Sequence, residues 1–192
     1  MANVDFFSLF RLNFFSLDRG NPMHQAPKRL TFEDPHGDSA VIPPDVSESW
    51  WQPQPANGHA EVIVSPRNVR TVHRFSCGTQ TLPPGGTVRL HAHDTSEEVL
   101  YVIEGQGAAE VDGKHYRMTP NTTLYLGHNK SHTFVNDGPG DLKWVWFFLP
   151  GGLEDFFEGI GRKRHPRDAT PEPFARPDDA KAIERATVFA SK

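Results

Sequence analysis

Several features that are common in other proteins are scarce or missing here. Cys77 is the single cysteine among 192 residues, which excludes an intramolecular disulfide and fits a reducing cytoplasm. No apolar stretch approaches the length of a membrane span, so we expect no membrane segment. The net charge of −4 and the pI near 6.2 give no basic surface for nucleic acid. The chain also has no G-x-G-x-x-G motif, P-loop, or serine or cysteine nucleophile motif, so we expect metal-centred chemistry on a small organic molecule.

The first 22 residues are apolar but do not form an ordinary signal peptide. A basic start is missing, Asp5 comes early, and Arg11 and Asn13 interrupt the apolar run. We therefore expect a cytoplasmic protein. Two interpretations of this segment stay open: Met23 is the true start, or the segment is an apolar arm that packs on a neighbouring subunit.

Proline, glycine and short apolar runs divide the chain into three expected parts. Residues 1–46 form an extended N-terminal arm, residues 47–150 a β-barrel, and residues 151–192 a C-terminal tail with short helices. Asp112-Gly113 is a favoured pair for a tight type I′ hairpin turn. The β-rich runs between the turn signals are residues 61–66, 69–76, 86–93, 98–105, 107–118, 122–127, 131–136 and 141–150. This regular spacing predicts an all-β sandwich or barrel.

His91 and His93 are separated by one residue. Residues two apart in a strand point to the same face, so both imidazoles project together at a separation that suits two ligands of one ion. Glu98 follows them, with Glu97 as a competing acidic ligand, and His132 adds a third imidazole. Neutral imidazole is the commonest metal ligand, and a carboxylate adds charge that favours a divalent cation. These side chains predict a mononuclear metal site.

The same residues resemble the two motifs of the cupins. The first motif is met by Gly85, His91, His93, Glu98 and Gly105, and the second by Pro120, His132 and Asn136. The six-residue distance from Glu98 to Gly105 favours Glu98 over Glu97 as the ligand. Thr122 stands where a glycine is usual and His128 where a proline often precedes the ligand histidine. Both departures concern the shape of turns and not the ligands.

The resemblance implies the cupin double-stranded β-helix, a jelly-roll barrel. The chain has no internal repeat, so we expect one barrel. The resemblance also implies one divalent transition metal per chain: Fe2+ in first place, with Mn2+, Ni2+, Co2+ or Zn2+ as alternatives. Four protein ligands would close a tetrahedral zinc site, whereas a six-coordinate ion would keep two positions open for substrate.

Strand alternation suggests which neighbours face the substrate. Arg89 lies two residues before His91 and should share its face, where it either anchors a substrate anion or pairs with a protein carboxylate at the barrel rim. Phe134 shares the face of His132, and Trp146 lies in a strand that is apolar on both faces. We expect Arg89, Phe134 and Trp146 to bind an aromatic or otherwise apolar substrate in preference to a sugar.

The stretch of residues 144–157, W-V-W-F-F-L-P-G-G-L-E-D-F-F, resembles small quercetin-dioxygenase-like single cupins. This implies oxygenative cleavage of an enolisable substrate, with Glu98 also acting as general base if its pKa is raised. A non-oxidative lyase, decarboxylase, isomerase or cyclase that uses the metal as a Lewis acid is one alternative. A binding cupin without turnover is another. Because cupin barrels commonly pair, we expect a homodimer.

Overall fold

The computed structural model describes residues 39–44 and 46–190. The expectations for residues 1–38, including the Met23 question and most of the N-terminal arm, lie outside the described residues. The elements in chain order are β1 (Glu48–Trp51), β2 (His59–Val64), β3 (Ser76–Leu82), β4 (Thr87–His91), β5 (Glu97–Glu104), β6 (Gly107–Val111), β7 (Lys114–Met118), β8 (Thr123–Leu126), β9 (His132–Val135), β10 (Leu142–Leu149), α1 (Leu153–Ile160), β11 (Arg162–Lys163) and α2 (Ala180–Ala186).

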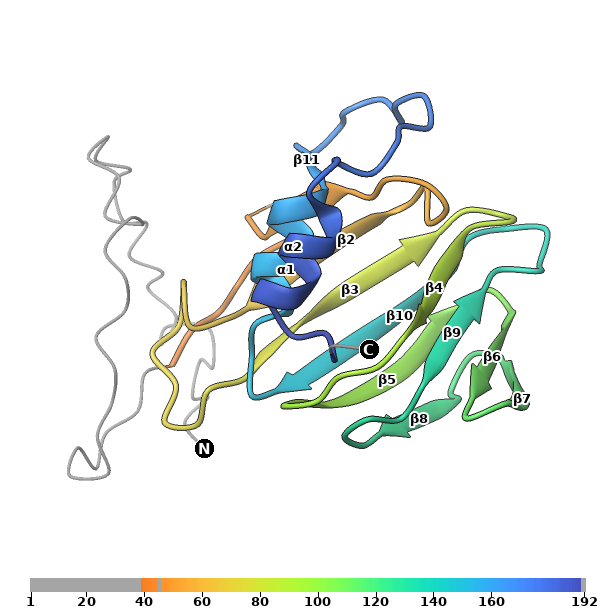
Figure 1. Ribbon diagram of the computed structural model, residues 1–192. Helices are drawn as coiled ribbons and strands as arrows, with labels where there is room; N and C mark the ends of the chain where they lie inside the picture. The colour runs from red at the N-terminus through yellow and green to blue at the C-terminus, as the bar shows by residue number, and fades with distance from the viewer. Residues whose placement is uncertain (1–38, 45, 191–192) are drawn as a thin grey trace, which may run out of the picture.

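The strands form two antiparallel sheets (Figure 1). The larger sheet has the order β11-β1-β2-β3-β10-β5-β8, and the smaller one has the order β4-β9-β6-β7. Side chains from both sheets join one hydrophobic core, with Leu100 and Trp144 from the larger sheet and Ala109 and Phe134 from the smaller. This arrangement confirms the predicted all-β class. Among the described residues, no helix has the length and apolar character needed to cross a membrane.

Strand β10 supplies much of the core through strict alternation. Trp144 and Trp146 are 1% and 0% exposed, whereas Phe147 and Leu149 on the opposite face are 39% and 44% exposed. Burying a large apolar side chain stabilises the fold by roughly 1.5–3 kcal/mol. The tryptophans therefore fill the core of their own chain and offer no surface to a partner. The homodimer stays a prediction.

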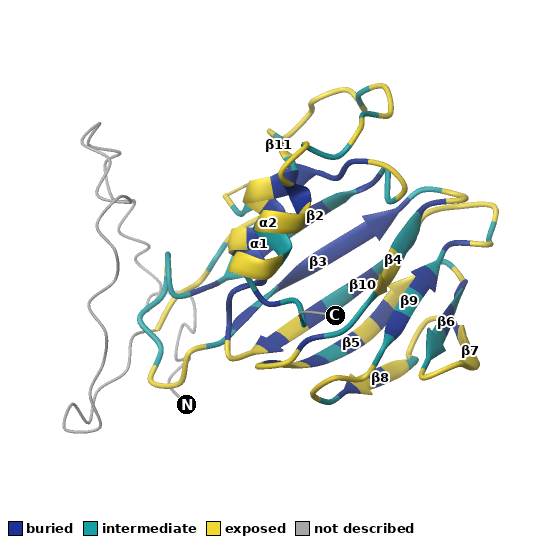
Figure 2. Cartoon of the chain, in the orientation of Figure 1, coloured by how far each residue is buried: buried dark blue, intermediate teal, exposed yellow. Residues whose placement is uncertain are grey.

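Strand β3 lies in the middle of the larger sheet, but its position differs from the expected strand at residues 69–76. The structure places it at Ser76–Leu82, and Figure 2 shows it buried along most of its length. The segment S-C-G-T-Q-T-L has weak strand propensity. A Cβ atom at Gly78 would lie 1.8 Å from the Glu61 carbonyl oxygen and 2.6 Å from the Trp146 ring. Packing therefore requires a glycine at position 78, and no local sequence pattern predicts this requirement.

Two predicted turns depend on left-handed backbone. Asp112 and Gly113 have φ values of 48° and 76°, as a type I′ turn requires, and they join β6 to β7 as expected. Gly105 has φ 76°, and a Cβ atom there would lie 2.0 Å from the Asp141 carbonyl oxygen. The glycine of the motif is thus needed both for backbone conformation and for space.

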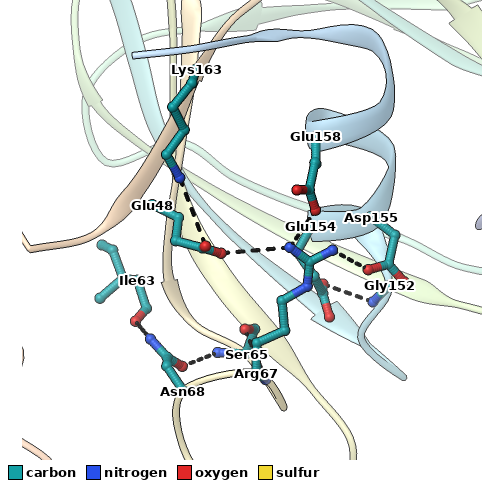
Figure 3. A network of polar contacts seen from close by, with 10 residues as sticks. All are labelled: Glu48, Ile63, Ser65, Arg67, Asn68, Gly152, Glu154, Asp155, Glu158 and Lys163. Atoms are coloured by element: carbon teal, nitrogen blue, oxygen red, sulfur yellow. Dashed lines mark hydrogen bonds and ion pairs between the residues drawn. The ribbon is translucent and has the colours of Figure 1, made fainter. Parts of the chain in front are cut away.

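Helix α1, one of the short helices expected in the C-terminal tail, packs on the inward face of the larger sheet, with the Phe157 and Trp146 ring centroids 5.7 Å apart. Arg67, in the loop after β2, holds the helix from the other side (Figure 3). Its guanidinium donates hydrogen bonds to Asp155 at 2.5 Å and Glu158 at 2.6 Å. The segment after α1 then returns as β11 and pairs with β1, so the larger sheet continues beyond residue 150.

Candidate metal centre

Four predicted ligands come together between the two sheets. His91 ends β4, His93 follows two residues later, and His132 begins β9, where it pairs with His91 in register. Glu98 comes from β5 in the larger sheet. One potential ligand atom from each of the four side chains lies within 4.8 Å of the others. The sheets thus converge on a group of three imidazoles and one carboxylate that could hold a metal ion.

The orientation of the three imidazoles is fixed by main-chain carbonyls. His91 Nδ1 lies 2.7 Å from the Arg89 carbonyl oxygen, and His132 Nδ1 lies 2.7 Å from that of Lys130. His93 Nδ1 lies 2.9 Å from the carbonyl oxygen of Val188, 95 residues away in the chain. A carbonyl can only accept, so each Nδ1 carries the proton and each Nε2 keeps its lone pair for a ligand.

Three buried atoms at the centre have no hydrogen-bond partner among the described residues: His93 Nε2, His132 Nε2 and Glu98 Oε2. Glu98 Oε2 lies 3.4 Å from His132 Nε2 and 3.6 Å from His93 Nε2. Leaving buried polar atoms unpaired costs about 1–3 kcal/mol each. A divalent ion would satisfy all of them, and imidazole nitrogen with carboxylate oxygen is the donor set such ions prefer. The residues therefore fit a transition metal.

The electrostatics of Glu98 differ from the expectation for a general base. Burial acts to raise its pKa, but the adjacent imidazoles of His132 and His93, when they carry a second proton on Nε2 in the absence of an ion, outweigh burial, and the pKa then lies below its usual range. The expected direction was upward. In this arrangement Glu98 is an ionised ligand, and its role as a base stays a prediction.

A β-bulge interrupts the alternation in β4. Val88 pairs with Phe134 and His91 pairs with His132, so two residues of β4 lie opposite a single residue of β9. Val88 and His91 therefore share the inward face although they are three residues apart. The expectation that Arg89 shares this face is corrected for that reason.

Arg89 instead lies at the rim. Its side chain is 54% exposed, and its guanidinium is 3.9 Å from the Glu184 carboxylate of α2. Of the two expected roles of Arg89, an anchor for a substrate anion or a partner of a protein carboxylate at the rim, this contact is the second. Arg89 nevertheless lines the cavity described next, so a role in binding stays a prediction.

A cavity of about 510 Å³ opens beside the ligand cluster. His91, His93 and Glu98 line it together with Phe134, whose role in substrate binding stays a prediction. Trp146 does not line the cavity, because α1 packs against its ring through Phe157 and encloses it in the core. The apolar wall comes instead from Leu153, Phe156, Phe157 and Ile160 of α1 and from Phe189.

The C-terminal segment after α2 is the part of the site that sequence reasoning missed. Phe189 places its ring centroid 5.1 Å from those of both His91 and His93, and Ala190 N donates to the Ala92 carbonyl at 2.8 Å. With the Val188 carbonyl on His93, the segment closes one side of the ligand cluster. The available signal was the apolar pair Val188-Phe189 after a polar helix.

Comparison with known proteins agrees with this fold and site. Residues 78–148 match the Cupin_2 family of cupin domains, a region that contains all four candidate ligands. The double-stranded arrangement of antiparallel sheets and the matched domain define a cupin barrel. Residues 78–148 therefore form a domain of the cupin superfamily.

Individual relatives are similar over part of their length. The chain is 31% identical to an oxalate-binding protein of Thermotoga maritima over 64 residues, 33% of this chain and 53% of that protein. It is 30% identical to quercetin 2,3-dioxygenase of Bacillus subtilis over 79 residues, 41% of this chain and 23% of that enzyme. It thus spans about half or less of these curated relatives. The structure of the polyketide cyclase RemF from Streptomyces resistomycificus superposes with a TM-score of 0.52 at 14% identity, covering 59% of this chain and 81% of RemF, and shows the fold alone.

Proposed function

We propose that the protein is a metal-dependent cupin enzyme, a dioxygenase that acts on an enolisable aromatic or otherwise apolar small molecule. The observation that carries the proposal is the convergence of three imidazoles and one carboxylate, with buried and unpartnered ligand atoms, at the end of a cavity of about 510 Å³. Similarity to a quercetin 2,3-dioxygenase over 79 residues supports the oxidative reaction.

His91, His93, Glu98 and His132 would hold the ion, for which Fe2+ is our first choice and Mn2+, Ni2+, Co2+ or Zn2+ are alternatives. A bound ion of this kind supplies Lewis acidity and, where it is redox-active, a route for electrons to oxygen. The carbonyl-bound Nδ1 atoms keep all three imidazoles oriented before the ion arrives.

We propose that residues lining the cavity exclude water and move the substrate proton. Phe134, Phe156 and Phe189 exclude water from the side of the cavity nearest the ligands and favour a flat apolar substrate. Glu98 is the carboxylate that lies among the imidazoles, so it is the group we propose takes the proton from the substrate hydroxyl. This removal would leave an enolate, the electron-rich form that oxygen attacks.

The experiment joins elemental analysis to oxygen consumption. Protein purified without oxygen and reloaded with Fe2+ should retain about one ion per chain and consume oxygen only when 3-hydroxyflavone is added. His132→Ala should lose the metal, because it removes a coordinating nitrogen. His115→Ala is the matched control, since His115 is exposed on β7, the edge strand at the opposite end of the smaller sheet from β4, and is not one of the four clustered residues.

The outcomes separate the candidate functions. Retained metal without oxygen consumption, for every metal tried, would favour a non-oxidative lyase, decarboxylase, isomerase or cyclase. Substrate binding without any product would favour a binding cupin. Full metal content in His132→Ala would contradict the site itself.

A further inference from the structure

We propose that the cavity selects an organic anion, with an apolar body directed at the metal centre and a negatively charged group held at a basic mouth. This inference rests on the proposed function in placing the reacting end of the substrate at the ligand cluster. It adds a substrate class and a set of specificity residues that lie outside the ligand set.

The mouth is formed by α2 on one side and β4 on the other. Lys181, Glu184 and Arg185 are spaced three and four residues apart, so they lie on one face of α2, and all three line the cavity. Arg89 lines it from the β4 bulge, and Arg176 lines it from the segment before α2. Figure 1 shows α2 beside α1, in front of β2 and β3, with the segment after α2 up to residue 190 passing in front of β10.

The charges at this mouth do not cancel. Glu184 accepts a hydrogen bond from Arg176 at 2.7 Å and lies 3.9 Å from Arg89, so one carboxylate is shared between two guanidinium groups. Lys181 and Arg185 are exposed, and within the described part of the chain neither has an ion-pair partner. The lining residues at the mouth therefore include four cations, Arg89, Arg176, Lys181 and Arg185, and one carboxylate, Glu184.

This excess of positive charge is not a consequence of composition. The whole chain carries a formal charge of −4, yet the cationic side chains outnumber the acidic ones where the cavity meets solvent. A cleft lined by one sign of charge concentrates ligands of the opposite sign and speeds their association. Guanidinium groups in particular bind carboxylates through paired hydrogen bonds.

The cavity beyond the mouth requires more than a small anion. Its volume of about 510 Å³ lies within the usual range for organic ligands, and its inner wall carries Phe134, Phe156 and Phe189. A two-carbon dianion would be too small to cover these phenylalanine side chains and would leave them in contact with water. An aromatic anion would instead cover the phenylalanine rings and reach both the ligand cluster and the mouth.

The test compares two probes of the same shape, 3-hydroxyflavone-4′-carboxylate and 3-hydroxyflavone-4′-carboxamide. Both carry the same hydroxyl and ketone for the metal, and only the first carries a negative charge at the far end. Affinities are measured by fluorescence titration on Zn2+-loaded and on metal-free full-length protein. We expect the carboxylate to bind at least tenfold more tightly than the amide, and less so at high salt.

A double variant, Lys181→Gln with Arg185→Gln, should lower the affinity for the carboxylate at least tenfold and leave the amide within about twofold. The matched control is Lys114→Gln with Arg167→Gln, which removes the same charges at exposed positions that do not line the cavity. Equal affinities for the two probes in the unaltered protein would overturn the proposal. So would an unchanged preference in the double variant, or oxalate binding as tightly as the flavone carboxylate. Since turnover is not required, these results are independent of oxygen consumption.

Discussion

Deleting residues 187–192 removes the carbonyl oxygen of Val188, which accepts the Nδ1 proton of His93 at 2.9 Å. Without that acceptor, the imidazole of His93 can rotate or carry its proton on Nε2, and the metal-facing lone pair is lost for part of the time. We therefore expect the truncated protein to bind metal more weakly although all four ligands are intact.

The magnitude follows from the kind of contact that is lost. Removing a partner that orients a ligating histidine typically weakens metal binding by about 10- to 100-fold, or roughly 1.4–2.7 kcal/mol. The Val188 bond is buried, so water replaces it poorly, and we expect the upper half of that range. Phe189→Ala removes the ring but keeps the backbone, including the bond from Ala190 N to the Ala92 carbonyl, so it should cost less than about threefold.

The assay is competition with a chromogenic chelator at fixed pH, using Zn2+ for the truncated, Phe189→Ala and unaltered proteins. Thermal unfolding in excess chelator checks that each variant is folded without metal. A folded truncated protein with metal affinity within about threefold of the full chain would refute the role of the carbonyl. A loss in Phe189→Ala as large as that of the truncation would assign the effect to the ring instead.

Three further predictions concern the ligand set, the pH response and a turn. Glu98→Gln should weaken metal binding by more than about 100-fold in the same competition assay, because it removes the one charged ligand. The pKa of His59 is lowered from 6.5 to about 4, chiefly by burial, so the unfolded chain binds the extra proton between those values. The free energy of unfolding should therefore fall as pH drops from 6.5 to 4, and His59→Gln should flatten that fall in chemical denaturation. Gly105→Ala should destabilise the fold by at least about 2 kcal/mol, because of its φ of 76° and the contact with Asp141, whereas Gly140→Ala, with open space around it, should have little effect.

The cluster of four candidate ligands was predictable because most of its signal is local. His91 and His93 are close in sequence, Glu98 follows within a few residues, and the motifs constrain the turns that bring His132 alongside. The need for glycine at position 105 could be predicted in the same way, since few other residues readily adopt a left-handed backbone conformation. Each of these features depends on a few neighbouring residues.

Features that depend on packing between distant segments were not predictable. Alternation assigned Arg89 to the inward face, but a bulge that pairs two residues of β4 with one of β9 reversed its direction. The apolar pattern of β10 identified an inward face without revealing that α1 would cover Trp146. The contact between His93 and Val188 joins positions 95 residues apart, and nothing in either local sequence announces it.

The candidate metal ligands and most of the residues around the cavity come from different parts of the chain. This explains why the family resemblance indicates a metal site but not a particular substrate. All four candidate ligands lie within the matched residues 78–148, whereas α1, α2 and the segment to Ala190 follow that region. Those later elements supply much of the apolar wall, most of the mouth charges and the carbonyl that orients His93. Relatives that share the matched region therefore need not share what surrounds it. Substrate choice in this chain should respond more to changes in residues 153–190 than to conservative changes among the strands that carry the ligands.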